Sequence, residues 1–173
     1  YNGSYSTTSI KVSNSTLELK RAELNIKLNA DNGSSIQMED TVIERWGSNI
    51  LTIKDSSVTS INTVLKGGSA EQDYPAVFLS RSTAKLQNTE VIQPLYRAAV
   101  CLTNSASLES IGTSLTSIRA ISSRVCIEKT VIRESLMLES NSFCRVSDYV
   151  DIKGENEEKI DIYCGTSVLI ANI

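Results

Sequence analysis

Apolar residues recur along this chain in a short frame: an apolar residue, any residue, a second apolar residue, two polar residues, then Ser or Thr. Side chains alternate between the two faces of a strand, so the two apolar positions predict a strand with one buried face. The Ser or Thr falls where the chain must turn, because its hydroxyl can bond backbone groups at a corner. The six frames are Ile10/Val12/Ser15, Ile36/Met38/Thr41, Leu51/Ile53/Ser56, Val77/Leu79/Ser82, Val100/Leu102/Ser105 and Val125/Ile127/Thr130.

The spacing of these frames predicts a solenoid. Their starts fall at positions 10, 36, 51, 77, 100 and 125, so every interval but one has a length typical of a solenoid coil. We therefore predict an all-β fold, a single-stranded parallel β-helix with about six to seven coils of roughly 23–26 residues. The interval from Ile36 to Leu51 is too short for a whole coil, which predicts that Leu51 begins a second strand of the coil opened at Ile36.

The repeat covers most of the chain and predicts a single β-helix domain over residues 1–173, as a fragment of a longer chain. Residues 1–9 are expected to form a leading segment. Residues 154–173 are expected to form the last coil or a cap, because Gly154 to Lys159 is strongly charged and departs from the frame. Within the domain, the inward positions Ile53, Leu79, Leu102 and Ile127 are predicted to stack as one apolar ladder.

The frames and their corner residues resemble the right-handed parallel β-helix superfamily, which includes phage tailspikes, pectate-lyase-like proteins and secreted adhesins. The resemblance extends from about Ile10 to Ile152 and rests on periodicity and corner chemistry. It implies an extracellular, cell-surface or virion location. A second resemblance, to bacterial leucine-rich repeats, rests on Ser57 to Ile61 and Ser114 to Ile118, but that family's proline and Ala-Phe pair are missing.

An apolar stripe is predicted on the outside of the solenoid. Phe78, Cys101 and Cys126 each occupy the middle position of a frame, which should face outward. Either the inward assignment is reversed in those coils or something covers the stripe, and covered apolar surface tends to be an interface. The resemblance to tailspikes implies a homotrimer through this stripe. The four cysteines include no C-x-x-C pair, which leaves a ladder of free thiols and disulfides both open.

Composition and charge exclude several classes of function. The net charge is −3 and the 17 basic residues are scattered, so we expect no nucleic-acid partner. No apolar run reaches the roughly 20 residues that a membrane helix needs, so we expect no membrane insertion. The chain has no histidine, which removes His-based catalytic triads and His metal sites. We expect no cofactor and no metal, and the sequence specifies no catalytic residues.

Aromatic and charged residues precede several strands by a few positions. On a regular coil they would line up along one edge, where rings can stack on the apolar faces of sugars and charged groups can bond hydroxyls. The alternative is that they only cover the edge of the core. The predicted carbohydrate-binding residues are Arg45, Trp46, Asp73, Tyr74, Tyr96, Arg97 and Arg119.

Three functions remain open at this point. The first is a noncatalytic β-helical segment of a surface protein that binds polysaccharide, a cell-surface glycan or a host surface. The second is a fragment of a polysaccharide-degrading tailspike or lyase, with carboxylates such as Glu44, Asp73 or Glu90 near the groove. The third is a purely structural stalk. The absence of histidine and of paired acids favours the first and third, so we lean against an enzyme.

Overall fold

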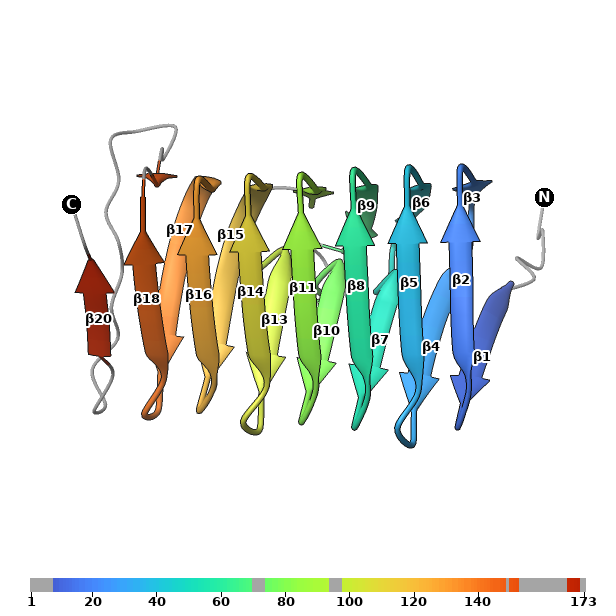
Figure 1. The fold of residues 1–173 in the computed structure, drawn as a ribbon, viewed down its shortest axis with the longest axis horizontal. Helices are drawn as coiled ribbons and strands as arrows, with labels where there is room; N and C mark the ends of the chain where they lie inside the picture. Colours follow the sequence, from blue (N-terminus) through green and yellow to red (C-terminus); the bar gives the residue numbers. More distant parts are fainter. Residues whose placement is uncertain (1–7, 70–73, 94–97, 149, 153–167, 172–173) are drawn as a thin grey trace.

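The fold is an all-β parallel solenoid whose rungs follow one another along the long axis, with the two chain ends at opposite ends (Figure 1). The computed structural model describes residues 8–69, 74–93, 98–148, 150–152 and 168–171. Each rung contributes up to three strands, and every strand pairs in parallel with its equivalent in the next rung. Parallel stacking satisfies the backbone groups of inner rungs on both sides and leaves strand edges only at the ends.

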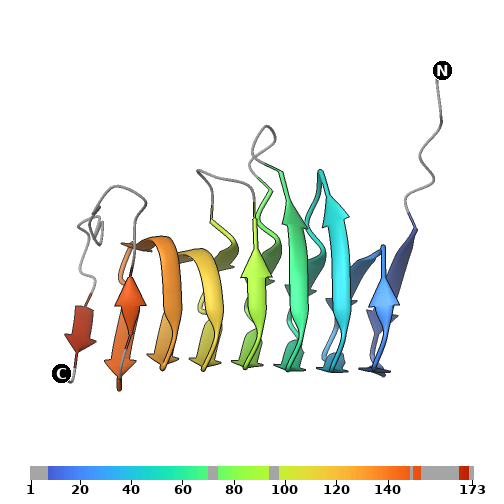
Figure 2. The ribbon, with the colours of Figure 1, turned by 90° about the horizontal axis from the view of Figure 1, so that it is seen from above.

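Three lines of strands run along the solenoid. The first comprises β1 (Ser9–Ser13), β4 (Lys27–Asp31), β7 (Leu51–Lys54), β10 (Val77–Ser80), β13 (Val100–Thr103), β15 (Ser114–Ile121) and β17 (Val131–Glu139). The second comprises β2 (Thr16–Lys20), β5 (Ser35–Glu39), β8 (Ser57–Ile61), β11 (Thr83–Gln87), β14 (Ser107–Ile111), β16 (Arg124–Glu128), β18 (Phe143–Ser147) and β20 (Val168–Ala171). The third comprises β3 (Glu23–Leu24), β6 (Val42–Trp46), β9 (Val64–Gly68) and β12 (Glu90–Ile92), continues in the first residues of β15 and β17, and ends at β19 (Asp151–Ile152). β15 and β17 therefore belong to two lines, and both bend around a corner without interruption (Figure 2).

The core is a set of stacked apolar columns inside the rungs. In the first line, Leu28, Leu51, Val77 and Val100 lie in register and are fully buried. The third line adds a column through Ile43, Leu65, Val91, Leu115 and Ile132, and the second adds one through Ile36, Val58, Ala84, Leu108 and Val125. The alternation of inward apolar and outward polar residues within each strand creates these columns.

The first two corners of each rung turn through residues in the left-handed backbone region. At the second corner this position is Asp40, Asn62, Asn88 or Lys129, with φ between 47° and 50°, or Gly112 at 61°. The residue after it is a buried Thr in five rungs, whose hydroxyl donates to the carbonyl two residues back, as in Thr63 to Ile61 (2.9 Å) and Thr130 to Glu128 (2.9 Å). The predicted role of Ser and Thr as corner residues is confirmed.

The first corner is held by a ladder of buried serines. The Ser82 hydroxyl accepts from the backbone N–H of Ser56 (3.2 Å) and donates to the carbonyls of Ile53 (3.0 Å) and Ser80 (2.7 Å). Ser56 in turn accepts from Ser34 N–H (3.1 Å). The hydroxyls thus supply hydrogen bonds to backbone groups that the strand ladders do not pair.

The third corner is the one that varies in length. It is short between Leu24 and Leu28. Within β15 and β17 the strand itself continues around this corner without a separate loop. Between β6 and β7, between β9 and β10, and between β12 and β13 it is longer, spanning residues 47–50, 69–76 and 93–99. The rung from Leu51 to Val77 is therefore the longest, and the rung from Val100 to Ile118 is among the shortest. Rung length varies more widely than the sequence predicts.

The six frames do not all begin equivalent strands. Ile10, Leu51, Val77 and Val100 belong to the first line, whereas Ile36 in β5 and Val125 in β16 belong to the second. Both lines follow the same alternation and both end at a Ser or Thr corner, so the frame cannot distinguish them. Leu51 begins another strand of the turn that contains Ile36, as predicted, but it is the third strand, because β6 lies between.

The predicted apolar ladder is correct for three of its four residues. Ile53, Leu79 and Leu102 are in register and fully buried. Ile127 is also buried but lies on β16 in the other sheet, so its place in the ladder is wrong; Ala120 follows Leu102 instead. The break arises because the rungs after β13 are shorter, so the first line is reached again within β15, before the frame that contains Ile127.

The predicted outer stripe is not continuous. Phe78 and Cys101 are neighbours on β10 and β13, face outward and are half-buried, while their flanking residues Val77 and Leu79 point into the core. The inward assignment therefore stands. Cys126 lies on β16 in the second line, and the third neighbour in the stripe is Arg119. Residues 1–7 and most of the predicted last coil or cap, together with Cys164, lie outside the described residues.

Candidate functional site

The predicted sugar-binding edge centres on the ends of β6 and β9, where the third corner is long. We define the Trp46 surface as Glu44, Trp46, Lys66 and Tyr74. Ile43 of β6 is buried, so alternation turns Glu44 and Trp46 outward. The indole Nε1 of Trp46 donates to Glu44 Oε1 (3.1 Å), and Lys66 Nζ lies 3.6 Å from Glu44 Oε2. Glu44 therefore anchors the indole and is itself balanced by a cation.

Gly68 brings the two exposed aromatic residues together. It pairs with Trp46 in the β6–β9 register, and the chain after β9 returns over it through the bridge between Ser69 and Tyr74. A Cβ at Gly68 would lie 2.7 Å from the Tyr74 carbonyl oxygen and 2.8 Å from the Gln93 side chain, and its φ is 91°. Only glycine combines this backbone conformation with so close an approach.

The return of the chain over Gly68 is fixed by a buried glutamine. Gln93 Nε2 donates to the Tyr74 carbonyl (3.2 Å), and Gln93 Oε1 accepts from Ala76 N–H (3.0 Å). The segment is held by backbone contacts, so the Tyr74 side chain is left 43% exposed, and Trp46 is 48% exposed. Two aromatic side chains thus stand outward from residues that adjoin the same glycine.

The remaining predicted residues divide into two groups. Arg45 lies next to Trp46 in the chain, but alternation on β6 turns its side chain to the opposite side of the strand. Its Nη1 lies 3.5 Å from both the carbonyl oxygen and the Oδ1 of Asn25. Arg119 lies elsewhere, on the first line between Cys101 and Met137. It donates to Glu139 through Nε (2.8 Å) and Nη2 (3.3 Å). Asp73, Tyr96 and Arg97 lie outside the described residues.

The carboxylates considered for catalysis are separated and paired with cations. Glu44 contacts Lys66, and Glu90 accepts from Arg133 (2.9 Å). Glu44 and Glu90 lie on strands separated by β9 and do not face each other in register. Asp73 is outside the described part of the chain. Among the described residues, no cluster of three or more Cys, Asp or Glu side chains could hold a metal ion.

Sequence reasoning missed the structural roles of Glu44, the Gly67-Gly68 pair and Ser48 in this region. Glu44 was considered only as a catalytic carboxylate, although its position two residues before Trp46 on a strand places both on one face. The Gly67-Gly68 pair was the available signal for a close backbone approach. Ser48, buried next to the Gly68 bridge, has a hydroxyl without a hydrogen-bond partner among the described residues, and nothing in the sequence marks it.

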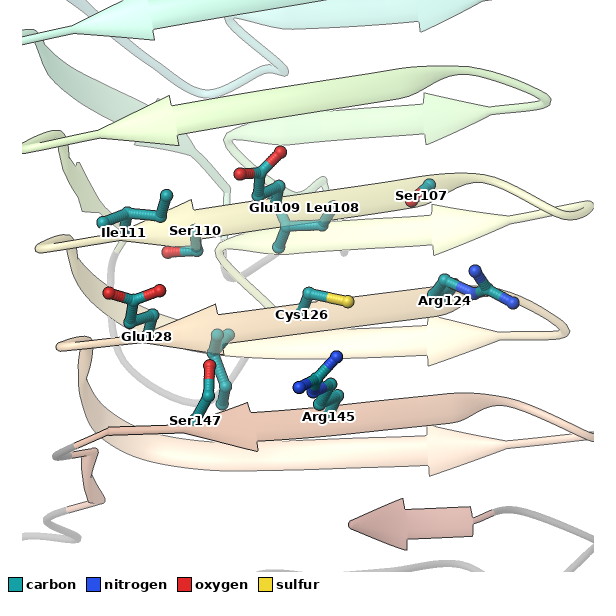
Figure 3. Close-up of a pocket in the computed structure, with 11 residues that line it drawn as sticks. Ser107, Leu108, Glu109, Ser110, Ile111, Arg124, Cys126, Glu128, Arg145 and Ser147 are labelled. Carbon is teal, nitrogen blue, oxygen red and sulfur yellow. The ribbon is translucent and has the colours of Figure 1, made fainter. Parts of the chain in front are cut away.

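A second concave surface lies on the outer face of the other sheet. We define the β16 depression as the open hollow of about 460 Å³ over β14, β16 and β18 that Figure 3 shows. Arg124, Cys126 and Glu128 of β16, Glu109 of β14, and Arg145 and Ser147 of β18 line it. From the sequence, Cys126 was considered only as part of the stripe, and neither arginine was singled out.

Charges outside these two surfaces are mostly paired from rung to rung. Lys11 contacts Asp31 (2.9 Å), and Arg81 binds both oxygens of Asp55 (2.6 and 2.7 Å). Within the described residues no helix is long and apolar enough to cross a membrane. Comparison of the chain with protein-family models, with curated proteins and with solved structures finds no match, so the fold and the two surfaces carry the functional argument.

Proposed function

We propose that this chain is a noncatalytic β-solenoid segment of an extracellular or virion surface protein, and that the Trp46 surface binds carbohydrate. The observation that carries the proposal is the fixed, exposed pair of aromatic side chains around Gly68. Trp46 is held by Glu44 and Tyr74 by the backbone contacts of Gln93, and both side chains remain exposed. Large exposed aromatics on a rigid element are typical of binding surfaces.

The chemistry around the pair suits a sugar. A ring face gives the apolar C–H side of a sugar a surface to stack on, and the Glu44 and Lys66 groups offer acceptors and donors for hydroxyls. The residues lie at the long third corner, where insertions project from a scaffold whose other two corners are nearly constant. Binding residues concentrate on such loops.

The superfamily assignment belongs to the same proposal. Parallel rungs with polar corners suit the right-handed β-helix group of tailspikes, pectate-lyase-like proteins and adhesins, and a surface location with a homotrimeric assembly goes with it. The half-buried neighbours Phe78 and Cys101 are the part of the predicted stripe that remains available for such an assembly. Sedimentation velocity of the purified chain tests the trimer directly.

The alternatives are separated by one set of measurements. A glycan array is run with the wild-type chain beside assays for new reducing ends and for unsaturated uronates. The proposal predicts array binding without product in either assay. Product formation would favour the polysaccharide-degrading alternative, and the absence of both binding and product would favour the structural stalk.

Variants then locate the site. Trp46→Ala and Tyr74→Ala are expected to abolish glycan binding, and the sequence extends this expectation to Tyr96→Ala. Their thermal unfolding midpoints should stay close to the wild-type value, because exposed side chains contribute little to folding. Ile10→Ala is the matched control, since Ile10 is an exposed apolar residue (37%) at the end of the solenoid. Glycan binding that survives in Trp46→Ala contradicts the proposed site.

A further inference from the structure

We propose that the β16 depression is a second binding site, which takes the carboxylate of an acidic saccharide between Arg124 and Arg145. The proposal does not rest on the Trp46 surface, which lies on the third line of strands nearer the N-terminal end. The depression, of about 460 Å³, falls within the roughly 300–1,000 Å³ typical of small-molecule sites.

Neither arginine has an acidic partner among the described residues, a feature that they share with Arg21 and Arg45. Arg81, Arg119 and Arg133 each bind a carboxylate at 2.6 to 2.9 Å. Arg124 instead places its guanidinium 5.5 Å from the centre of the Phe143 ring, and no carboxylate of the described residues lies within ion-pair distance of Arg124 or Arg145. Both side chains are exposed. Their donors are therefore available to a ligand.

The register sets the spacing of the two guanidinium groups. Arg124 of β16 faces Phe143, and Arg145 of β18 faces Cys126, so the two arginines are diagonal neighbours on adjacent strands. Diagonal positions on one face of a sheet are within reach of long side chains. In Figure 3 Arg145 points from β18 toward Cys126, while Arg124 lies at the start of β16 with its guanidinium directed away from Cys126. The pair borders the hollow rather than closing it.

The depression exists because the small side chain of Cys126 stands at its centre. This residue occupies the outward column of the second line between Glu109 and Arg145. A lysine or glutamate here would fill the space and continue the rung-to-rung ion pairs. The small thiol leaves it open.

The acidic residues of the lining do not cancel the arginines. Glu109 Oε1 is bound by Lys85 (3.1 Å), and Glu128 Oε1 lies 3.7 Å from Lys129 Nζ. Both lysines lie outside the lining. Lys129 also contacts Asp148 (3.3 Å). The lining itself holds two arginines and two glutamates, and of these four groups only the arginines lack an ion-pair partner. The planar fork of arginine matches the two oxygens of a carboxylate.

The probe pair is trigalacturonate and the same trimer with its carboxylates methyl-esterified, which differ in charge and little else. Isothermal titration at low ionic strength should show binding of the acid and at least tenfold weaker binding of the ester. Arg145→Gln and Arg124→Gln should each weaken acid binding at least fivefold. Lys54→Gln removes the same charge from an exposed position of the other sheet and should change binding less than twofold.

Alkylation of Cys126 tests whether the ligand binds in the β16 depression. Bound trigalacturonate should slow the reaction of Cys126 with iodoacetamide severalfold, with Cys101, half-exposed on the other sheet, as the internal reference. Trp46→Ala should leave this protection intact, which separates this site from the proposed glycan surface. Equal binding of acid and ester, equal binding of inorganic sulfate and the trimer, or wild-type affinity in both Gln variants would overturn the proposal.

Discussion

Single inward side chains determine how strongly neighbouring rungs adhere. Leu79 and Leu102 are fully buried between the residues above and below them in one column. We expect Leu79→Ala and Leu102→Ala each to lower the free energy of unfolding by about 2–5 kcal/mol, because each leaves a cavity in a stacked core. Urea unfolding followed by circular dichroism measures the change. Thr52→Ala, on the outward side of the same line, is the control and should change it by less than about 0.5 kcal/mol.

One buried residue also makes stability depend on alkaline pH. Burial raises the pKa of the Cys144 thiol from its usual 9.0 to about 12, and nearby Cys126 adds to the shift. The unfolded thiol ionises near pH 9, so its contribution is complete below that value and is lost progressively as the pH rises toward 12. The hydrogen bond with Asp148 raises the pKa of Lys129, so the stability that this contact contributes is likewise lost as the pH rises.

Cys144→Val separates the thiol from these other groups. Valine fits an inward position beside Val125 and cannot ionise. Unfolding free energies between pH 8 and 10.5 should fall less steeply in Cys144→Val than in the wild type. Cys101→Val, at an outward position of the other sheet, is the comparison. Identical slopes for Cys144→Val and the wild type would show that the buried thiol does not contribute.

At the scale of the strand and its corner, left-handed residues set the shape of each rung. The left-handed conformation costs most L-residues roughly 1–2 kcal/mol, whereas it costs glycine almost nothing. Arg21 adopts it with φ of 50° and is exposed, so Arg21→Gly should raise the unfolding midpoint. Gly112→Ala should lower it, because the new Cβ would lie 2.6 Å from Asn88 Oδ1 at a φ of 61°. Differential scanning calorimetry measures both unfolding midpoints. A lower midpoint for Arg21→Gly, or a higher one for Gly112→Ala, would refute the strain argument.

The element scale is also where sequence reasoning was strongest and where it failed. Alternation identified the strands that contain Ile53, Leu79 and Leu102, because burial of alternate residues appears in the sequence as alternating apolar and polar positions. It could not tell the first line from the second, since both present the same apolar pair before a Ser or Thr corner. Leu28, Ile118 and Leu136 begin strand segments of the first line but escaped the frame.

The reason for those omissions is physical. In the segments that begin at Leu28 and Leu136 the first corner is one residue longer, so Ser34 and Ser142 fall one position too late for the frame. In the segment that begins at Ile118, Ile121 stands at a position where the frame requires a polar residue. At the candidate site, exposure of Trp46 followed from its place near a corner. The contacts of Gly68 with Tyr74 and Gln93 join residues of two rungs and have no local sequence signal.

For the molecule as a whole, stability should vary along the axis. In the described residues β1, β2 and β3 pair on one side only, and the first rung contains the exposed Ile10. Solenoids behave as chains of units coupled to their nearest neighbours, so the end unit opens most easily. Hydrogen exchange should be fastest in β1–β3 and slowest around β8, β11 and β14. Leu102→Ala should speed exchange most in the rungs that contain β10, β13 and β15, and uniform exchange along the chain would contradict this description.

The unequal corners also determine where foreign sequence can enter. Between inward residues the second corner takes the same number of positions in each rung from β2 to β17, while the third is shortest between Leu115 and Ile118 and longest between Leu65 and Val77. A peptide inserted between Ser69 and Tyr74 should therefore leave the rungs stacked, whereas the same peptide beside Asn62 should unstack them. The solenoid is thus a display scaffold, with one edge open to new loops and two edges closed to them.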